Sequence, residues 1–145
     1  MTGWIVILLI GVALSPLVWL RPSARQSRQM ALRMAARRMG LAMQLTQQEW
    51  PHWLTCSPPK SCAQYHRGRR AGHVDTWVYW QPEAGQWLNQ WREPCDDAPM
   101  LARLSALPSD VYKAEAGRQM IAVYWGERGD EHDLQKVATF LAELA

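Results

Sequence analysis

The amino-acid sequence predicts an α+β protein: an N-terminal transmembrane helix, a basic juxtamembrane helix, and a small α+β domain with a mostly antiparallel sheet. Three observations lead to this fold class. The chain begins with an uncharged apolar run, continues with an arginine-rich run of good helix formers, and then alternates strand-like and helix-like segments joined by local turns. Its 145 residues suffice for one ordinary domain. We therefore divide the chain into residues 1–20, 21–39 and 40–145.

The apolar run from Gly3 to Leu20 predicts a membrane span. It carries no charge, and as a helix it would extend about 27 Å, close to the roughly 30 Å hydrocarbon core of a bilayer. Trp4 and Trp19 stand near its two ends, where an indole ring prefers the membrane interface. A cleaved signal peptide and a buried helix of a soluble protein are the alternatives. No basic side chain precedes the run, which disfavours the signal peptide.

The distribution of charge predicts the orientation of this span. Before Gln48 the chain carries six arginines and no acid, a net charge of +6, and after it the net charge is −3. Arg21, Arg25 and Arg28 come first after the apolar run and are expected at the membrane interface. The positive-inside rule places this flank in the cytoplasm and the N-terminus outside. We thus expect a single-pass protein of the bacterial inner (plasma) membrane, whose mildly acidic domain is not suited to nucleic acid.

Residues 22–39 are rich in Ala, Met, Arg and Gln and predict a weakly amphipathic helix. Ser23 is suited to cap its start, and Gly40 is suited to follow its end. Three roles are open for this helix. In the first, the helix is solvated and its arginines only enforce the topology. In the second, it contacts anionic lipid headgroups. In the third, it docks on a larger membrane protein complex. The expected partner of residues 3–20 is the lipid bilayer itself.

The run Val18-Trp19-Leu20-Arg21-Pro22 joins the apolar segment to a basic Gln/Arg helix that reaches Arg38. This N-terminal quarter is similar to the accessory preprotein translocase subunit YajC. That family continues into a Gly-rich β-domain with Gly-Asp and Gly-Gly-Ile patterns, which the residues after Gly40 do not show. The chain also resembles small, uncharacterised single-pass bacterial inner-membrane proteins with a Trp-rich tail. The resemblance to the translocase subunit implies an accessory role and transfers no catalytic residue.

The domain shows strand and hairpin patterns first and helical patterns later. Alternating apolar residues predict a strand over 41–46, and prolines predict a loop over 50–60. A short strand over 63–66 and a β-hairpin over 74–91, with its turn at Pro82–Gly85, are expected next. The remaining segments are a helix that starts within the acidic, proline-bearing run 96–99 and stops at Pro108, a short helix over 109–116, a strand over 119–125 and a final helix capped by Asp130.

Tryptophan is the most unusual feature of the composition, with nine in the chain. Four of them cluster on the predicted hairpin: Trp77, Trp80, Trp87 and Trp91. Large aromatic side chains fill the core of a small domain, but they are also favoured at interfaces with partners. The sequence leaves open whether this cluster is core or an exposed partner surface.

No motif indicates catalysis or a cofactor. The spacing between Cys56 and Cys62 does not match a structural zinc site, although His52, His66 and His73 lie nearby, and we assign no metal ligand. The basic stretch from Lys60 to His73 suits either an anion site or a solvated loop. The acidic residues over 127–133 are explained by the start of a helix, where carboxylates are favourable.

We therefore predict a single-pass membrane protein whose small cytoplasmic domain binds a partner and has no catalytic activity. One alternative is an accessory subunit of a larger membrane complex, similar to a preprotein translocase subunit. Another is a membrane-tethered metal-binding or enzymatic domain that uses the Cys/His loop over 52–73. The identity of the partner, the oligomeric state and any small-molecule ligand stay open.

Overall fold

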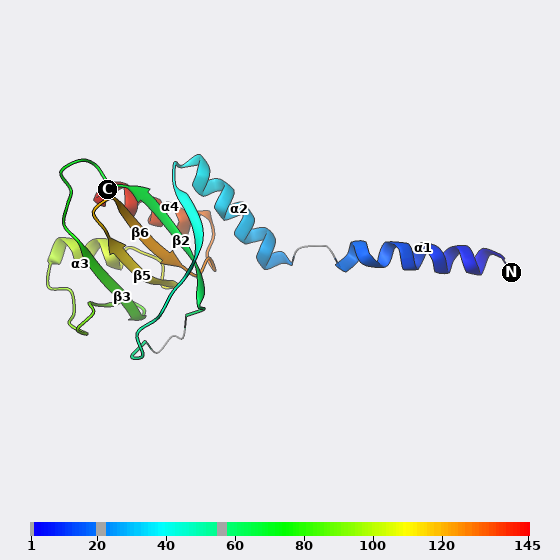
Figure 1. Cartoon of the computed structure of the whole chain (residues 1–145), viewed down its shortest axis with the longest axis horizontal. Helices are drawn as coiled ribbons and strands as arrows, with labels where there is room; N and C mark the ends of the chain where they lie inside the picture. The colour runs from blue at the N-terminus through cyan, green and yellow to red at the C-terminus, as the bar shows by residue number, and fades with distance from the viewer. Residues whose placement is uncertain (1, 20–22, 55–57) are drawn as a thin grey trace.

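The computed structural model describes residues 2–19, 23–54 and 58–145 and shows an α+β domain preceded by an isolated helix (Figure 1). The helices are α1 (Thr2–Trp19), α2 (Ala24–Arg38), α3 (Ala98–Ser105) and α4 (Glu131–Leu144). The strands are β1 (Ala42–Gln47), β2 (Ser61–Gly68), β3 (Trp77–Glu83), β4 (Gln86–Leu88), β5 (Val111–Ala116) and β6 (Met120–Trp125). The expected α+β class with an antiparallel sheet is therefore correct.

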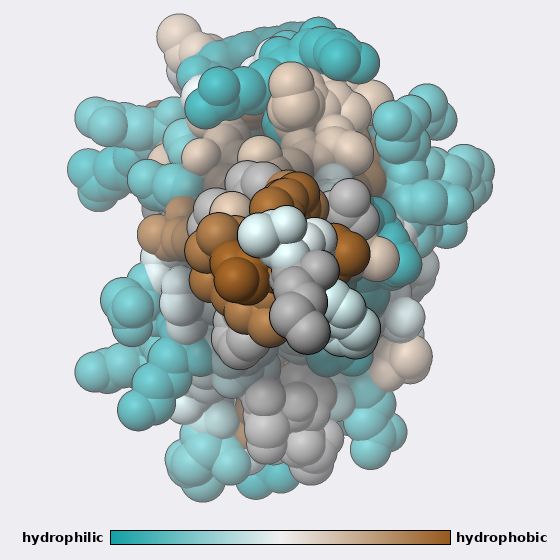
Figure 2. Space-filling view, turned by 90° about the vertical axis from the view of Figure 1, so that its right-hand side faces the viewer, coloured by the Kyte–Doolittle hydropathy of each residue, from teal (hydrophilic) through white to brown (hydrophobic). Residues whose placement is uncertain are grey.

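The predicted transmembrane helix is wrong. Helix α1 has 18 residues, Thr2–Trp19, and contains Pro16. In the part of the chain that the structure describes, no helix is both long enough and apolar enough to cross a membrane. The finding overturns the prediction of a single-pass inner-membrane protein with an outside N-terminus and a cytoplasmic domain. Helix α1 extends away from the domain (Figure 1). The large apolar side chains between Trp4 and Leu14 are exposed (Figure 2).

All six strands form one antiparallel sheet in the order β1-β2-β6-β5-β3-β4. The register aligns one row of side chains across five strands on the face that α2 and α4 cover: Met43, Tyr65, Val123, Ala114 and Tyr79. The next row points to the opposite face and is polar and aromatic: Gln44, Gln64, Tyr124, Lys113 and Trp80. The β1–β2 connection supplies Trp50, which packs on Tyr112 and Tyr124 over this second face.

The short helix predicted over 109–116 is wrong, because these residues form the end of a connection and strand β5. Lys, Glu and Ala in this segment favour a helix in isolation. In the fold, β5 lies between β3 and β6 and pairs with both, and its side chains alternate between buried and less buried positions. Backbone pairing with two neighbouring strands and burial in the core outweigh the weak preference of these residues for a helix.

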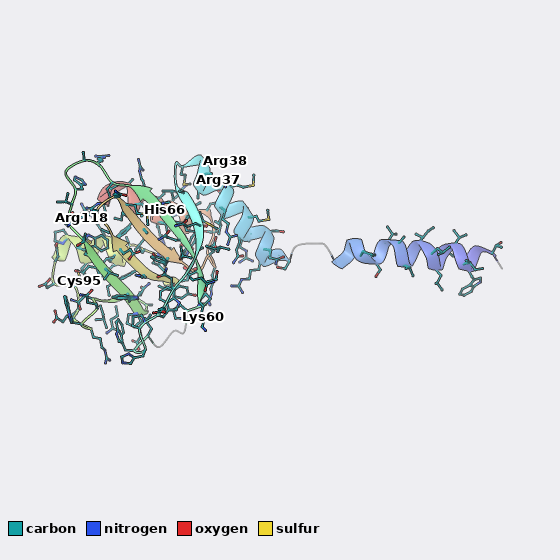
Figure 3. The ribbon with its side chains drawn as sticks, in the orientation of Figure 1. Arg37, Arg38, Lys60, His66, Cys95 and Arg118 are labelled. Carbon is teal, nitrogen blue, oxygen red and sulfur yellow. The ribbon has the colours of Figure 1, made fainter. Side chains whose placement is uncertain are left out.

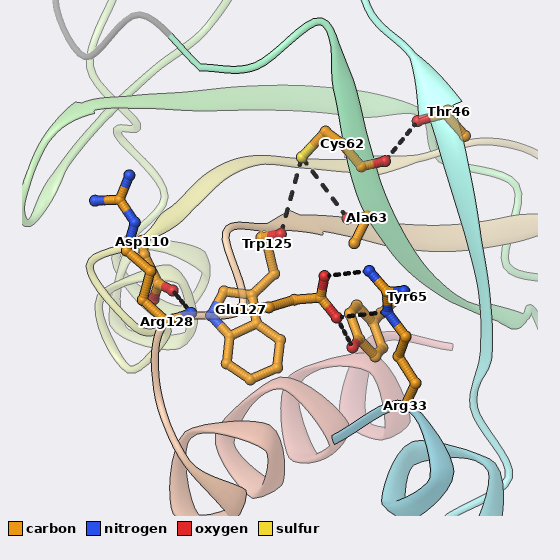
Figure 4. A network of polar contacts seen from close by, with 9 residues as sticks. All are labelled: Arg33, Thr46, Cys62, Ala63, Tyr65, Asp110, Trp125, Glu127 and Arg128. Carbon is orange, nitrogen blue, oxygen red and sulfur yellow. Dashed lines mark hydrogen bonds and ion pairs between the residues drawn. The ribbon is translucent and has the colours of Figure 1, made fainter. Parts of the chain in front are cut away.

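Helix α2 is attached to the sheet by a buried polar contact between Arg33, Tyr65 and Glu127 (Figure 4). Arg33 donates from Nε and Nη2 to the two carboxylate oxygens of Glu127, at 3.0 and 2.8 Å. The Tyr65 hydroxyl donates to the same carboxylate at 2.6 Å. The Glu127 side chain is 3% exposed, and that of Arg33 is 30% exposed. A bidentate, charge-assisted pair of this kind fixes the position of α2 as well as stabilising it.

Stability should fall in alkaline solution because two acidic groups are held neutral beside this contact. Burial, and then the nearby Glu127 carboxylate, raise the pKa of Cys62 to about 12, and burial followed by the hydrogen bond to Glu127 raises the pKa of Tyr65. Both groups lose their protons more readily in the unfolded chain. The stabilisation is therefore complete below about pH 9 and declines as the pH rises toward 12. The urea concentration at the midpoint of unfolding, measured at several pH values, should show this decline. In Cys62→Ala the decline should be shallower. An equally steep decline in this variant would contradict the role of Cys62.

Candidate functional site

The structure separates the four tryptophans of the predicted hairpin into core and surface residues. Trp87 is 1% exposed and belongs to the main core, whereas Trp91 is 70% exposed. Trp77 and Trp80 are half-buried, and each packs edge-on against another aromatic ring, Trp77 against Phe140 and Trp80 against Trp53. Of the four, only Trp91 presents most of its side chain to solvent. It is therefore the residue of this cluster best placed to contact a partner.

A tight turn after β4 holds Trp91 in this exposed position. The Asn89 side-chain oxygen accepts hydrogen bonds from the backbone N–H groups of Trp91 and Glu93, both at 3.0 Å. The Asn89 backbone adds bonds to Arg92 and Glu93. Arg92 has φ +62°, which is uncommon for a residue other than glycine. A turn closed by these bonds holds the large apolar side chain of Trp91 in a fixed, exposed position.

The first half of β3 has an open edge beside this turn. Residues Trp77 to Trp80 pair with β5 on one side. On the other side β4 pairs with Trp80 and Glu83, and the chain then turns away at Asn89. Within the described residues, no strand covers the edge from Trp77 to Tyr79. An open edge presents unpaired backbone donors and acceptors, which another extended segment can satisfy.

A cavity of about 530 Å³ lies along this edge. Three groups of residues line it: 76–79 from β3 and its start, 89–91 from the turn, and Glu115 and Ala116 from β5. Glu115 is the only charged residue among them, and it is paired with Lys113 at 3.4 Å and accepts a hydrogen bond from the Tyr124 hydroxyl. The cavity therefore offers backbone groups and apolar walls to an uncharged occupant. We refer to residues 76–79 and 89–91 together as the β3 edge groove.

Sequence reasoning found Trp91 but missed Asn89 and the open edge. The spacing Asn89-x-Trp91-x-Glu93 after a strand carries a signal for a side-chain-closed turn, because Asn favours such turns. The open edge carries no local signal, since it depends on the shortness of β4 and on the long-range pairing of β3 with β5.

The other predicted site residues are not brought together. Trp4, Arg25 and Arg28 are exposed, while Arg21 and the side chain of Trp19 lie outside the described residues. Their placement at a membrane interface came from the predicted span, and the structure shows nothing more than their exposure. The predicted basic stretch is spread over β2 and the segments on both sides of it: Lys60 precedes the strand, and His66 lies in its second half (Figure 3). Arg69 follows the strand and pairs with Asp75 at 2.6 Å.

The cysteines do not form a metal site in the part of the chain that the structure describes. No group of three or more His, Cys, Asp and Glu residues lies close enough there to hold an ion. Cys62 and Cys95 are buried free thiols, whereas Cys56 lies outside the described residues. Burial keeps the Cys62 thiol protonated, as its raised pKa indicates, and a protonated thiol is a poor nucleophile and metal ligand.

Comparisons of the chain with models of protein families, with curated proteins and with solved structures give no match. The resemblance of the N-terminal quarter to the YajC subunit accordingly stays a prediction.

Proposed function

We propose that this protein binds an extended peptide segment of a partner, which adds to the free edge of β3 and packs against Trp91. The observation that carries the proposal is the exposed Trp91, held by the Asn89 turn directly beside three strand residues with one unpaired edge. Strand addition of this kind obtains affinity from backbone hydrogen bonds and specificity from pockets for alternate side chains. An aromatic residue at the end of such a groove is a typical main contributor to binding energy.

The lining of the groove indicates which peptides fit. Val78 on one side of β3 and Trp77 and Tyr79 on the other present apolar walls. The single carboxylate, Glu115, is already paired, so the groove has no free charge with which to compensate a buried charged side chain. We therefore expect uncharged peptides that are rich in β-branched and aromatic residues and contain no proline at the paired positions.

Selection from a phage-displayed library of random peptides on the immobilised full-length protein tests this function. Resynthesised peptides from the enriched clones should bind the wild type in calorimetry, and Trp91→Ala should weaken them by about tenfold or more, which corresponds to about 1.4 kcal/mol. Amide hydrogen exchange at residues 77–79 should slow when peptide is bound, because strand addition occupies their free backbone groups.

Leu45→Ala is the matched control. Leu45 is an apolar side chain, 60% exposed, on β1 at the opposite end of the sheet. Peptide affinity should not change in this variant. The absence of any enriched peptide, or an equal loss of affinity in the Trp91 and Leu45 variants, would rule out the proposed groove.

A further inference from the structure

Two of the most exposed apolar side chains in the domain lie at or next to the β3 edge groove. Within the described part of residues 40–145, three large apolar side chains are mostly exposed: Leu45, Val74 and Trp91, by 60%, 69% and 70%. Trp91 lines the groove, and Val74 comes two residues before Thr76, the first residue of its lining. Leu45 lies on β1 at the opposite end of the sheet. Single exposed apolar residues are common on protein surfaces, whereas two beside one groove indicate a shared contact surface.

Val74 is held in its exposed position by a buried arginine in the connection between β2 and β3. The Arg69 side chain is 3% exposed and reaches along this connection to Asp75. Its Nη1 atom donates to the backbone oxygens of Asp75 and Gly117, and its Nη2 atom donates to the Asp75 carboxylate at 2.6 Å. The residue directly after Val74 is thereby tied, through both its backbone and its side chain, to the end of β5.

The Arg69–Asp75 pair fixes the approach to the groove without adding a free charge to it. The hydrogen bond from Arg69 lowers the pKa of Asp75, so the carboxylate stays ionised and balances the guanidinium. The arrangement leaves one buried donor unused, because Nε of Arg69 has no hydrogen-bond partner among the residues that the structure describes. The Asn89 turn therefore holds one exposed apolar side chain, and the Arg69–Asp75 pair holds another, next to the same groove.

We propose that the peptide in the β3 edge groove continues past Trp77 and contacts Val74, which gives it a second apolar anchor in addition to Trp91. This inference rests on the proposed strand addition at β3. The stretch from Val74 to Tyr79 has six residues, and an extended segment that runs beside all of them is about 20 Å long. The partner is therefore an uncharged, extended segment of about six residues or more, with one apolar side chain for Trp91 and another for Val74.

Shortened peptides and the variant Val74→Ser test the second anchor on the full-length protein. A peptide enriched by the phage selection is shortened residue by residue from each end, and calorimetry measures its affinity. Loss of the apolar residue that meets Val74 should weaken binding by about fivefold or more, because burial of a branched apolar side chain contributes free energy of this size. Val74→Ser should weaken binding of the complete peptide by the same factor. It should leave the affinity of the shortened peptide unchanged, because the contact is already absent there.

Leu45→Ser is the matched control, since it makes a comparable change at an exposed apolar side chain far from the groove, and it should leave both affinities unchanged. Asp75→Asn breaks the ion pair with Arg69 and should weaken binding of the complete peptide by about twofold, the size expected for an exposed ion pair. If Val74→Ser binds the complete peptide as tightly as the wild type does, while Trp91→Ala binds it more weakly, the second anchor is wrong and the β3 edge groove stands. A library that yields no binding peptide overturns both.

Discussion

Arg33→Met is expected to lower the free energy of unfolding by about 3–5 kcal/mol, among the largest effects of any single substitution in this chain. The reason is the environment of its partner. Glu127 is 3% exposed, so loss of Arg33 leaves a buried carboxylate whose only remaining side-chain hydrogen bond within the described residues comes from the Tyr65 hydroxyl. Urea-induced unfolding followed by tryptophan fluorescence measures the change.

Replacement of the other member of the pair, Glu127→Leu, should lower the free energy of unfolding by less than Arg33→Met does. Arg33 is 30% exposed, and its long side chain can turn toward water when the carboxylate is absent. The double variant Arg33→Met/Glu127→Leu should recover much of the loss of the Arg33 variant, because no unpaired buried charge remains. If the double variant loses as much free energy of unfolding as the two single variants together, the pair does not act as a unit.

Trp87→Ala should destabilise the domain by about 3–5 kcal/mol, whereas Trp91→Ala should change its stability by less than about 0.5 kcal/mol. The two residues lie on the same predicted hairpin and undergo the same chemical change. Trp87 is 1% exposed and packs in the main core, so its removal leaves a large cavity. Trp91 is 70% exposed and contributes little packing. Thermal unfolding of the two variants provides the comparison.

This pair also separates stability from binding. Trp91→Ala should abolish most peptide affinity in a protein that unfolds at an unchanged temperature, so any loss of binding is assigned to the contact itself. If Trp91→Ala lowers stability as much as Trp87→Ala, Trp91 belongs to the core and the argument for the β3 edge groove fails.

Local features of the chain could be predicted because they depend on neighbouring residues. Ser23 caps α2 through the N–H of Gln26 and Asp130 caps α4, as the sequence indicated, and α3 begins within the acidic, proline-bearing start over 96–99. Gly40 has φ +81° directly after α2, where a helix end favours glycine. Such signals act within one turn of the chain, so no knowledge of the rest of the fold is needed to recognise them.

Features that depend on distant residues could not be predicted. The segment 109–116 has helix-forming residues, but pairing with β3 and β6 makes it a strand. The apolar run at the N-terminus predicted a membrane span that the structure does not show. The buried pair of Arg33 and Glu127 joins residues 94 positions apart, and nothing near either residue in the sequence indicates the other.

By itself, the sequence determined the α+β class, the caps of the helices and the presence of a tryptophan-rich hairpin, because these follow from short-range periodicity and from side chains that bond to their own backbone. Only the tertiary structure decided which tryptophan is core and which is surface, which strand edge stays open, and where Arg33 finds its carboxylate. Burial and edge exposure are set by strand order and by the elements packed on each face, and these depend on contacts between distant parts of the chain.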